Sequence, residues 1–189
     1  MDEIRPVGKV EIVPIAELNI QYIPVLTPED IWHETMAVST SPHVKLMQMF
    51  LYYGFDQKRM RLTDYFRERV RRRMLGMKRW TDKYILTHHA EKRYEILKSI
   101  KRSGYDKSQP ILVLKEPFWL TRFGFAPAWV KGKEIWTGAG RSSACCALGI
   151  KEIPVQWVED TRPGSGERGR FGKKIPKRVW EEIEACASR

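Results

Sequence analysis

The residues between 138 and 143 have the types and spacing of an anion-binding turn. They lie between two segments with the composition of strands, 133–137 and 153–158, and are Gly138, Ala139, Gly140, Arg141, Ser142 and Ser143. Glycines let the backbone turn sharply and approach a ligand, and the helix expected over 142–148 starts with amide groups that have no intrahelical partner. The positive end of a helix attracts an anion, and the Arg141 guanidinium can bind two phosphate oxygens at once. The stretch therefore predicts a phosphate site, although a strand, a glycine turn and a helix also occur in α/β proteins without one.

The same segment predicts how the chain crosses between two strands. Fifteen residues separate the strands expected over 133–137 and 153–158, and about a dozen suffice for a parallel crossover. We therefore expect these two strands to run parallel, with the glycine turn at one end.

Carboxylates and histidines are the next residues that could take part in phosphate chemistry. Cleaving a phosphoanhydride or phosphodiester requires charge neutralisation, an aligned water and usually a magnesium ion held by one or two carboxylates. The candidates for metal ligand or base are Glu34 and Glu134, with Glu11 and Glu17 as further choices, although each also fits an ordinary surface position. His89 or its neighbour His88 could act as general base or leaving-group acid, but adjacent histidines on a helix point in different directions. No spacing assigns the metal ligands.

Positive charge is concentrated in two segments of the chain. The whole chain has a net charge of +11. Residues 58–102 contain 16 basic and 5 acidic side chains, and residues 161–178 contain 7 basic and 1 acidic side chain. Such clusters are typical of nucleic-acid binding, although an acidic protein would also complement them. The candidate nucleic-acid-binding residues are Arg67, Arg69, Arg71, Arg72, Arg73, Lys78, Arg79, Arg168 and Arg170. The alternative for the arginines of 67–73 is a solvated basic helix face.

The pattern of apolar residues predicts a single domain of mixed secondary structure. We expect strands over 10–15, 110–114, 133–137 and 153–158, and helices over 43–53, 62–75 and 91–102. Residues 19–42 should be mostly irregular, except for a short helix that begins at Thr27 and carries His33 and Glu34. The domain would span residues 1–160 with a helical insertion at about 27–90, followed by a basic glycine-rich linker and terminal helix over 161–189. Aromatic residues within 118–129 could cover the core or stack on a base.

Composition and missing motifs exclude several classes of protein. No apolar run approaches the roughly 20 residues of a membrane span, and the N-terminus lacks the features of a secretory signal, so we expect a cytoplasmic protein. Cys145 and Cys146 are adjacent and Cys186 is isolated, a pattern that favours packing over a disulfide or zinc site. The HExxH, paired CxxC, GxSxG and Walker lysine motifs are absent from the sequence.

Several segments, taken in order, resemble the ParB/sulfiredoxin superfamily. They are residues 10–18, 93–100, 138–144 and 148–155, with Gly104, Gln109 and Pro110 between the second and the third. The resemblance implies an α/β (α+β) fold with a small mixed sheet, and a nucleotide whose phosphates lie on the GxxR turn. It places Gly104, Gln109 and Pro110 near the base or sugar. Sulfiredoxins have their catalytic cysteine where Ala139 stands, so sulfinic acid reduction is not expected.

The resemblance leaves more than one function open. Members of the superfamily include CTP-binding partition proteins, free serine kinases and plasmid proteins with nuclease or nucleotidase activity. Partition proteins usually continue into a DNA-reading domain. The length of this chain is instead similar to that of the plasmid fertility-inhibition proteins of the Osa and FiwA type. The expectation is a DNA-associated enzyme that binds ATP or another NTP with Mg²⁺, hydrolyses it, and cuts DNA or interferes with a nucleoprotein transfer complex in plasmid or T-DNA transfer. The alternatives are a binding module for DNA or an acidic protein with a nucleotide switch, and a small-molecule kinase of the serine type.

Overall fold

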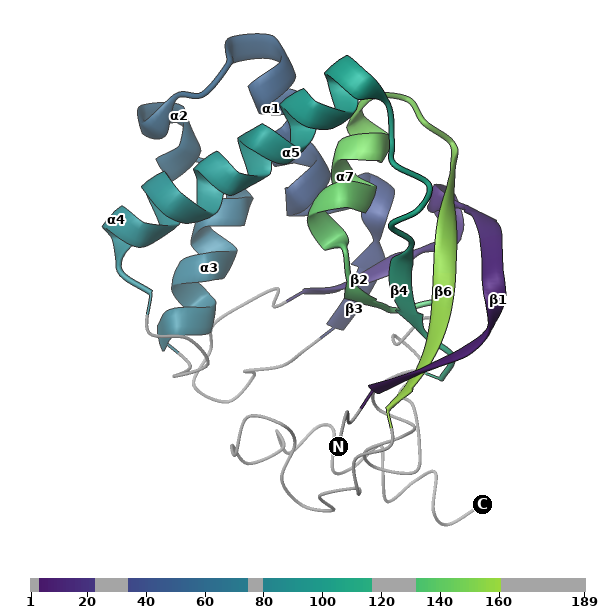
Figure 1. Ribbon diagram of the computed structural model, residues 1–189. Helices are drawn as coiled ribbons and strands as arrows, with labels where there is room; N and C mark the ends of the chain where they lie inside the picture. The colour runs from purple at the N-terminus through teal and green to yellow at the C-terminus, as the bar shows by residue number, and fades with distance from the viewer. Residues whose placement is uncertain (1–3, 23–33, 75–79, 117–131, 161–189) are drawn as a thin grey trace.

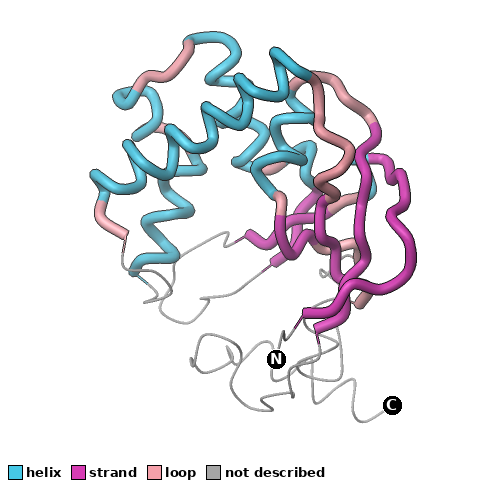
Figure 2. Tube along the Cα trace, viewed as in Figure 1, coloured by secondary structure: helices cyan, strands magenta, loops and turns pink. Residues whose placement is uncertain are grey.

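The chain forms an α+β structure in which helices gather on one side and strands on the other (Figures 1 and 2). The computed structural model describes residues 4–22, 34–74, 80–116 and 132–160. Within these ranges the strands form a four-stranded mixed sheet and a separate two-stranded antiparallel sheet. The expected α/β (α+β) class is therefore confirmed.

The larger sheet places the short buried strand β4 in its interior. The sheet has the order β1 (Ile4–Pro14), β6 (Glu152–Asp160), β4 (Ile111–Leu114) and β5 (Ile135–Thr137). β6 is antiparallel to β1 and parallel to β4, whereas β5 is antiparallel to β4. The predicted parallel pair of 133–137 and 153–158 is therefore wrong. β4 lies between the two strands that the glycine turn connects. Three of the four residues of this apolar strand are buried, as is typical of a strand inside a sheet.

The smaller sheet lies where the sequence predicts irregular structure. β2 (Asn19–Tyr22) pairs antiparallel with β3 (Glu34–Ala37). Glu34 therefore begins a strand and not the expected helix, while Thr27 and His33 lie outside the described residues. The backbone N–H of Asn19 donates to the Lys133 carbonyl at 3.0 Å, so β2 is anchored by a residue more than a hundred positions away. Hydrophobic periodicity reports only neighbours in sequence and does not reveal such an anchor.

The helices lie close to the positions predicted from the sequence, but several begin or end at other residues than predicted. They are α1 (Pro42–Tyr53), α2 (Gln57–Arg61), α3 (Asp64–Met74), α4 (Asp82–Tyr84), α5 (Ala90–Ser103) and α7 (Ala139–Ala147), with a π-helical turn at Ile85–His89 and 3₁₀ turns at Ile15–Glu17 and Val38–Thr40. The helices predicted over 43–53 and 91–102 correspond to α1 and α5. The one predicted over 62–75 is preceded by a separate helix, α2, which Asp56 caps through the Lys58 and Arg59 amides. Leu62 falls between the two helices and is 73% exposed, so it is not part of the apolar stripe of α3.

The core lies between the sheet and the helices. α1 contributes Leu46, Met47 and Phe50 to it, and Ser41 caps this helix by accepting from the Val44 amide. Cys145 on α7 is buried, and burial raises the pKa of its thiol to about 12, consistent with the packing role expected for it. No helix in the described ranges is both long enough and apolar enough to span a membrane.

Gly138 fixes the start of α7. Its φ of 110° is unfavourable for residues with a side chain, and helix α7 begins immediately after it. Ala139, Gly140 and Arg141 are therefore in the first helical turn and do not form the predicted loop, because one left-handed residue is enough to redirect the chain. A Cβ added to Gly138 would lie 2.6 Å from Ile111 Cδ1 on β4.

Replacing Gly138 with alanine should destabilise the fold. We expect Gly138→Ala to lower the free energy of unfolding by about 2 kcal/mol or more, because it combines backbone strain with overlap against Ile111. Gly132→Ala is the matched control, since no heavy atom lies within 4 Å of the added Cβ, and should change stability by less than about 0.5 kcal/mol. Urea denaturation of both variants measures the difference, and equal stabilities would contradict this account of the α7 start.

Candidate functional site

The N-terminus of α7 meets a guanidinium from α5. No side chain caps α7, so its first amide groups point toward the space before the helix. A Cβ added to Gly140 would lie 1.7 Å from Arg93 Nη1, which shows that this guanidinium packs against the first turn of α7. Glycine is thus required at 140 for the close approach of Arg93, and two positively charged groups face each other here.

Arg141 has a different role from the one predicted for it. Its Nη1 donates to the Gln109 carbonyl at 2.7 Å, and its Nη2 approaches the Pro110 carbonyl at 3.4 Å. The guanidinium therefore binds the start of β4 to α7. These contacts place Gln109 and Pro110 beside the first turn of α7, whereas Gly104 ends α5 with a φ of 76°. Their predicted place near the base or sugar of a nucleotide stays a prediction.

A tyrosine and a histidine lie on the other side of Arg93. The Tyr65 hydroxyl and His89 Nδ1 are 2.6 Å apart, and Arg93 Nε donates to the same hydroxyl at 3.4 Å. Tyr65 is fully buried, and the Arg69 guanidinium carbon lies over the face of its ring, 4.7 Å from the centroid. Since Arg93 donates to the tyrosine oxygen, the tyrosine proton is available for His89 Nδ1, and a neutral His89 then carries its own proton on Nε2.

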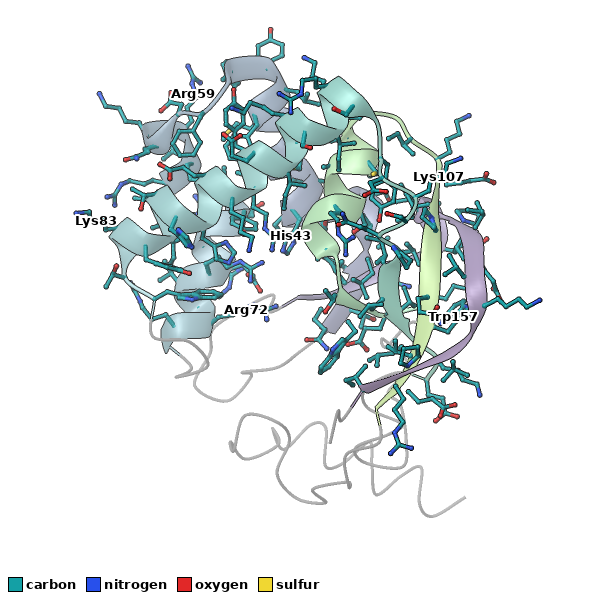
Figure 3. All side chains as sticks on the ribbon, in the orientation of Figure 1. His43, Arg59, Arg72, Lys83, Lys107 and Trp157 are labelled. Atoms are coloured by element: carbon teal, nitrogen blue, oxygen red, sulfur yellow. The ribbon has the colours of Figure 1, made fainter. Side chains whose placement is uncertain are left out.

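Two arginines of α3 enclose a buried carboxylate. Glu68 is 1% exposed and forms ion pairs with Arg69 Nε, at 3.4 Å, and with Arg72 Nε. Arg69 Nη2 contacts His43 Nε2, and Arg72 Nη2 donates to the Gln21 carbonyl of β2 at 3.2 Å. In the view of Figure 3, His43 and Arg72 lie between the ribbons of α3 and α7; His43 is buried and Arg72 is half-buried. α3 is thus connected to α1 and to the small sheet through charged groups.

These contacts form one continuous network, which we call the buried polar cluster. It consists of His43, Tyr65, Glu68, Arg69, Arg72, His89 and Arg93. At its edge the Gln21 amide donates to the Glu134 carboxylate, which is 1% exposed. Among the described residues of the cluster and its edge, the guanidinium groups of Arg69, Arg72 and Arg93 face the carboxylates of Glu68 and Glu134, and Arg72 and Arg93 are half-buried. The N-terminus of α7 adds further positive potential. The balance favours an additional anion.

Both histidines of the buried polar cluster are neutral at ordinary pH. Burial, followed by the charges of Arg69 and Arg93, lowers the pKa of His43 well below its usual value and that of His89 to about 3. Burial also lowers the pKa of Arg72, whereas for Arg69 the effect of burial is outweighed by Glu68 and Tyr65, so its pKa is raised. Both arginines remain charged, because an arginine pKa starts far above neutrality.

Some polar atoms of the site have no hydrogen-bond partner among the described residues. They are His43 Nδ1, Arg69 Nε, Glu68 Oε2 and Ser143 Oγ, and all of them are buried. Arg69 Nε and Glu68 Oε2 still attract each other as an ion pair. The other two, on α1 and α7, are groups able to donate to a ligand oxygen or to a water.

Comparison with family models, with curated proteins and with solved structures gives no match to this chain. The resemblance to the ParB/sulfiredoxin superfamily therefore stays a prediction, and the geometry must carry the functional argument.

The predicted nucleic-acid-binding arginines do not form one exposed face. Arg69 and Arg72 point inward and bind Glu68, and Arg73 pairs with Asp82. Arg67 is exposed and pairs with Asp64, and Arg71 is half-buried. Arg69 and Arg72 therefore belong neither to a solvated arginine face nor to an exposed phosphate-binding surface, because the spacing of α3 turns them toward α1 and β2. Lys78, Arg79, Arg168 and Arg170 lie outside the described residues.

The structure adds site residues that the sequence did not single out. None of Arg93, Tyr65, His43 and Glu68 was among the residues predicted to bind or react. A glutamate within a run of arginines was the available signal for an internal ion pair, since buried charges are paired. Conversely, the predicted Glu34 begins β3, and Glu134 is held by Gln21. Among the described residues, no three histidine, cysteine or acidic side chains lie together as a metal site.

The neutral histidines predict loss of stability in mild acid. Below about pH 6.5 the unfolded chain protonates His43 and His89 while the folded chain does not, so stability falls as the pH falls. We expect a decrease of about 2 to 3 kcal/mol in unfolding free energy between pH 7.5 and pH 5.5. Urea titrations at both pH values measure it. His43→Gln and His89→Gln should each remove about half of the pH dependence; the same slope in the double variant would contradict the assignment.

Proposed function

We propose that this protein binds a nucleoside triphosphate, with the phosphates at the N-terminus of α7 and beside Arg93. The observation that carries the proposal is the packing of the Arg93 guanidinium against Gly140. A guanidinium and the positive end of a helix repel each other unless an anion lies between or beside them. A polyphosphate supplies that charge and accepts from both kinds of donor.

We further propose that the bound triphosphate is hydrolysed. Transfer of a phosphoryl group is catalysed mainly by positioning and by stabilising negative charge, which Arg93 and the α7 amides can supply. His89 stays neutral at ordinary pH and is oriented through Tyr65, so its imidazole is suited to hydrogen-bond the attacking water or the transferred phosphoryl group. Magnesium would bind mainly through the phosphate oxygens, since this ion keeps several water ligands and needs only one or two carboxylates.

Association with DNA is part of the same proposal. Its support is the distribution of charge, with 16 basic and 5 acidic residues between 58 and 102. Within that range the exposed cations, such as Arg67, and not the buried Arg69 and Arg72, are the groups that could contact phosphates.

Nucleotide binding should depend on Arg93 and on the space beside Gly140. Magnesium ATP, CTP or GTP in excess should raise the melting temperature of the unmodified protein, because a ligand that binds the native state stabilises it by mass action. We expect Arg93→Gln to weaken binding by about tenfold or more, the loss typical of one charge-assisted hydrogen bond. Thermal-shift titrations over a range of nucleotide concentrations provide the affinities.

Two variants separate the site from the stability of the fold. Gly140→Ala displaces the Arg93 guanidinium but improves helix propensity by up to about 1 kcal/mol, so binding should fall while stability is kept. Lys92→Gln removes the neighbouring exposed cation of α5 and should bind nucleotide as the unmodified protein does. Unchanged affinity in both Arg93→Gln and Gly140→Ala would exclude this site.

Hydrolysis should require His89 more than it requires Arg141. With magnesium and saturating nucleotide, we expect His89→Gln to lower kcat for phosphate release by about a hundredfold with little change in nucleotide affinity. Arg141→Ala removes the bonds to Gln109 and Pro110 and should mainly lower stability. Saturable binding without phosphate release from the unmodified protein would instead show a nucleotide-controlled binding module.

A further inference from the structure

Two exposed tyrosines end helix α1. Tyr52 is 81% exposed and Tyr53 is 51% exposed, and their ring centroids lie 4.6 Å apart at an angle of 64°. Large aromatic side chains gain most when they are buried, so adjacent tyrosines in water are a feature that requires an explanation. Neither belongs to the hydrophobic core.

Positively charged side chains accompany these tyrosines. The Arg59 guanidinium lies 3.9 Å from the centroid of the Tyr53 ring. Residues 52–61 contain three basic side chains and one acidic side chain, Asp56. The Asp56 carboxylate accepts from the Lys58 and Arg59 amides at the start of α2, so it is partly engaged by the backbone. The end of α1 and helix α2 thus present tyrosine rings beside cations.

The same surface continues onto α5. The Tyr94 ring lies 5.8 Å from the Phe55 ring, and its hydroxyl is next to Gly54, which ends α1. Lys98 lies 5.1 Å from the centroid of the Tyr94 ring. Lys98 also lines a shallow, open hollow along the last turns of α5, together with Glu95, Ser99, Lys101 and Arg102. Residues 95–102 again have three basic side chains and one acidic one.

We propose that this aromatic–basic surface binds single-stranded nucleic acid. The surface consists of Tyr52, Tyr53, Lys58, Arg59, Tyr94, Lys98, Lys101 and Arg102. Unpaired bases can stack on the exposed tyrosine rings, and the cations of α2 and α5 bind the phosphates of the same strand. Such stacking contributes about 1 to 3 kcal/mol per base and needs no specific sequence, because every base has an aromatic face.

Single strands fit this surface better than duplex DNA or an acidic peptide. Bases in a duplex are already stacked on each other and are not available to tyrosines, and an acidic peptide would use the cations without the rings. Arg59 is exposed and lies at the outer edge of the helical half, away from His43 (Figure 3). The inference deepens the proposed association with DNA, which it assumes, and does not depend on nucleotide hydrolysis.

Fluorescence anisotropy with a labelled oligothymidine strand at low salt tests the proposal. We expect the double variant Tyr52→Ala, Tyr53→Ala to bind at least fivefold more weakly than the unmodified protein. The double variant Tyr52→Phe, Tyr53→Phe keeps both rings and should keep the affinity. Tyr84→Ala is the matched control, because Tyr84 is 38% exposed but stacks on Trp80, and it should bind normally. A duplex of the same length should bind with lower affinity and be insensitive to loss of the tyrosines.

Salt dependence gives a second and independent measure. Arg59→Gln and Lys98→Gln should each reduce the slope of log affinity against log salt by about 0.7, the value for one phosphate contact with a single strand. These exposed residues can be replaced without disturbing the core. The two measurements together therefore separate stacking from charge.

Several outcomes would overturn the proposal. The first is that the unmodified protein does not bind the single strand, and the second is that the tyrosine-to-alanine double variant keeps full affinity. The third is that this variant weakens duplex binding as much as single-strand binding. The fourth is that polyglutamate competes as effectively as unlabelled oligothymidine. The last result would indicate an acidic polypeptide partner. If nucleotides fail to stabilise the protein while the tyrosine-dependent binding holds, the nucleotide site fails and this surface stands.

Discussion

The buried carboxylate of Glu68 is the group on which the arrangement of the helices depends. It lies between Arg69 and Arg72, and these arginines in turn contact His43 of α1 and the Gln21 carbonyl of β2. Removing charges from water costs several kcal/mol per ion, and only close pairing offsets it. The carboxylate therefore holds three parts of the chain together by neutralising two cations that none of these parts could bury alone.

Stability alone does not account for such a network. A hydrophobic cluster of similar volume would often be as stable or more so, because burying ions is costly even when they are paired. The buried polar cluster retains more positive than negative charge and ends at Arg93 beside the N-terminus of α7. An excess of one sign in an interior is unfavourable unless a counter-ion joins it. This is the physical reason for the proposal that an anion binds at this site, and it does not depend on any resemblance.

The positive charge of the chain is thus divided between two environments. Inside, guanidinium groups are pre-oriented by pairing and by aromatic rings, which suits discrimination of a small polyanion. Outside, cations beside exposed tyrosines keep their mobility and hydration, which suits a long flexible strand. The arginines of α3 illustrate the division, since Arg69 and Arg72 face the interior while Arg67 faces solvent. Helix α3 contributes to both environments because residues only two positions apart in a helix lie on different faces of it.

Local sequence patterns predict the mixed α+β class, the helices α1 and α5, the buried strand β4 and a glycine turn ahead of α7. These features follow from hydrophobic period, capping residues and left-handed glycine, all of which act over a few neighbouring residues. Other features depend on packing between distant segments: β4 separates β5 from β6, residues 19–22 pair with 34–37, Arg141 binds the Gln109 carbonyl, and Arg93 meets Gly140. Each of these pairs residues distant in sequence, and the choice of partner depends on which apolar surfaces must be covered together. Local patterns do not carry that information.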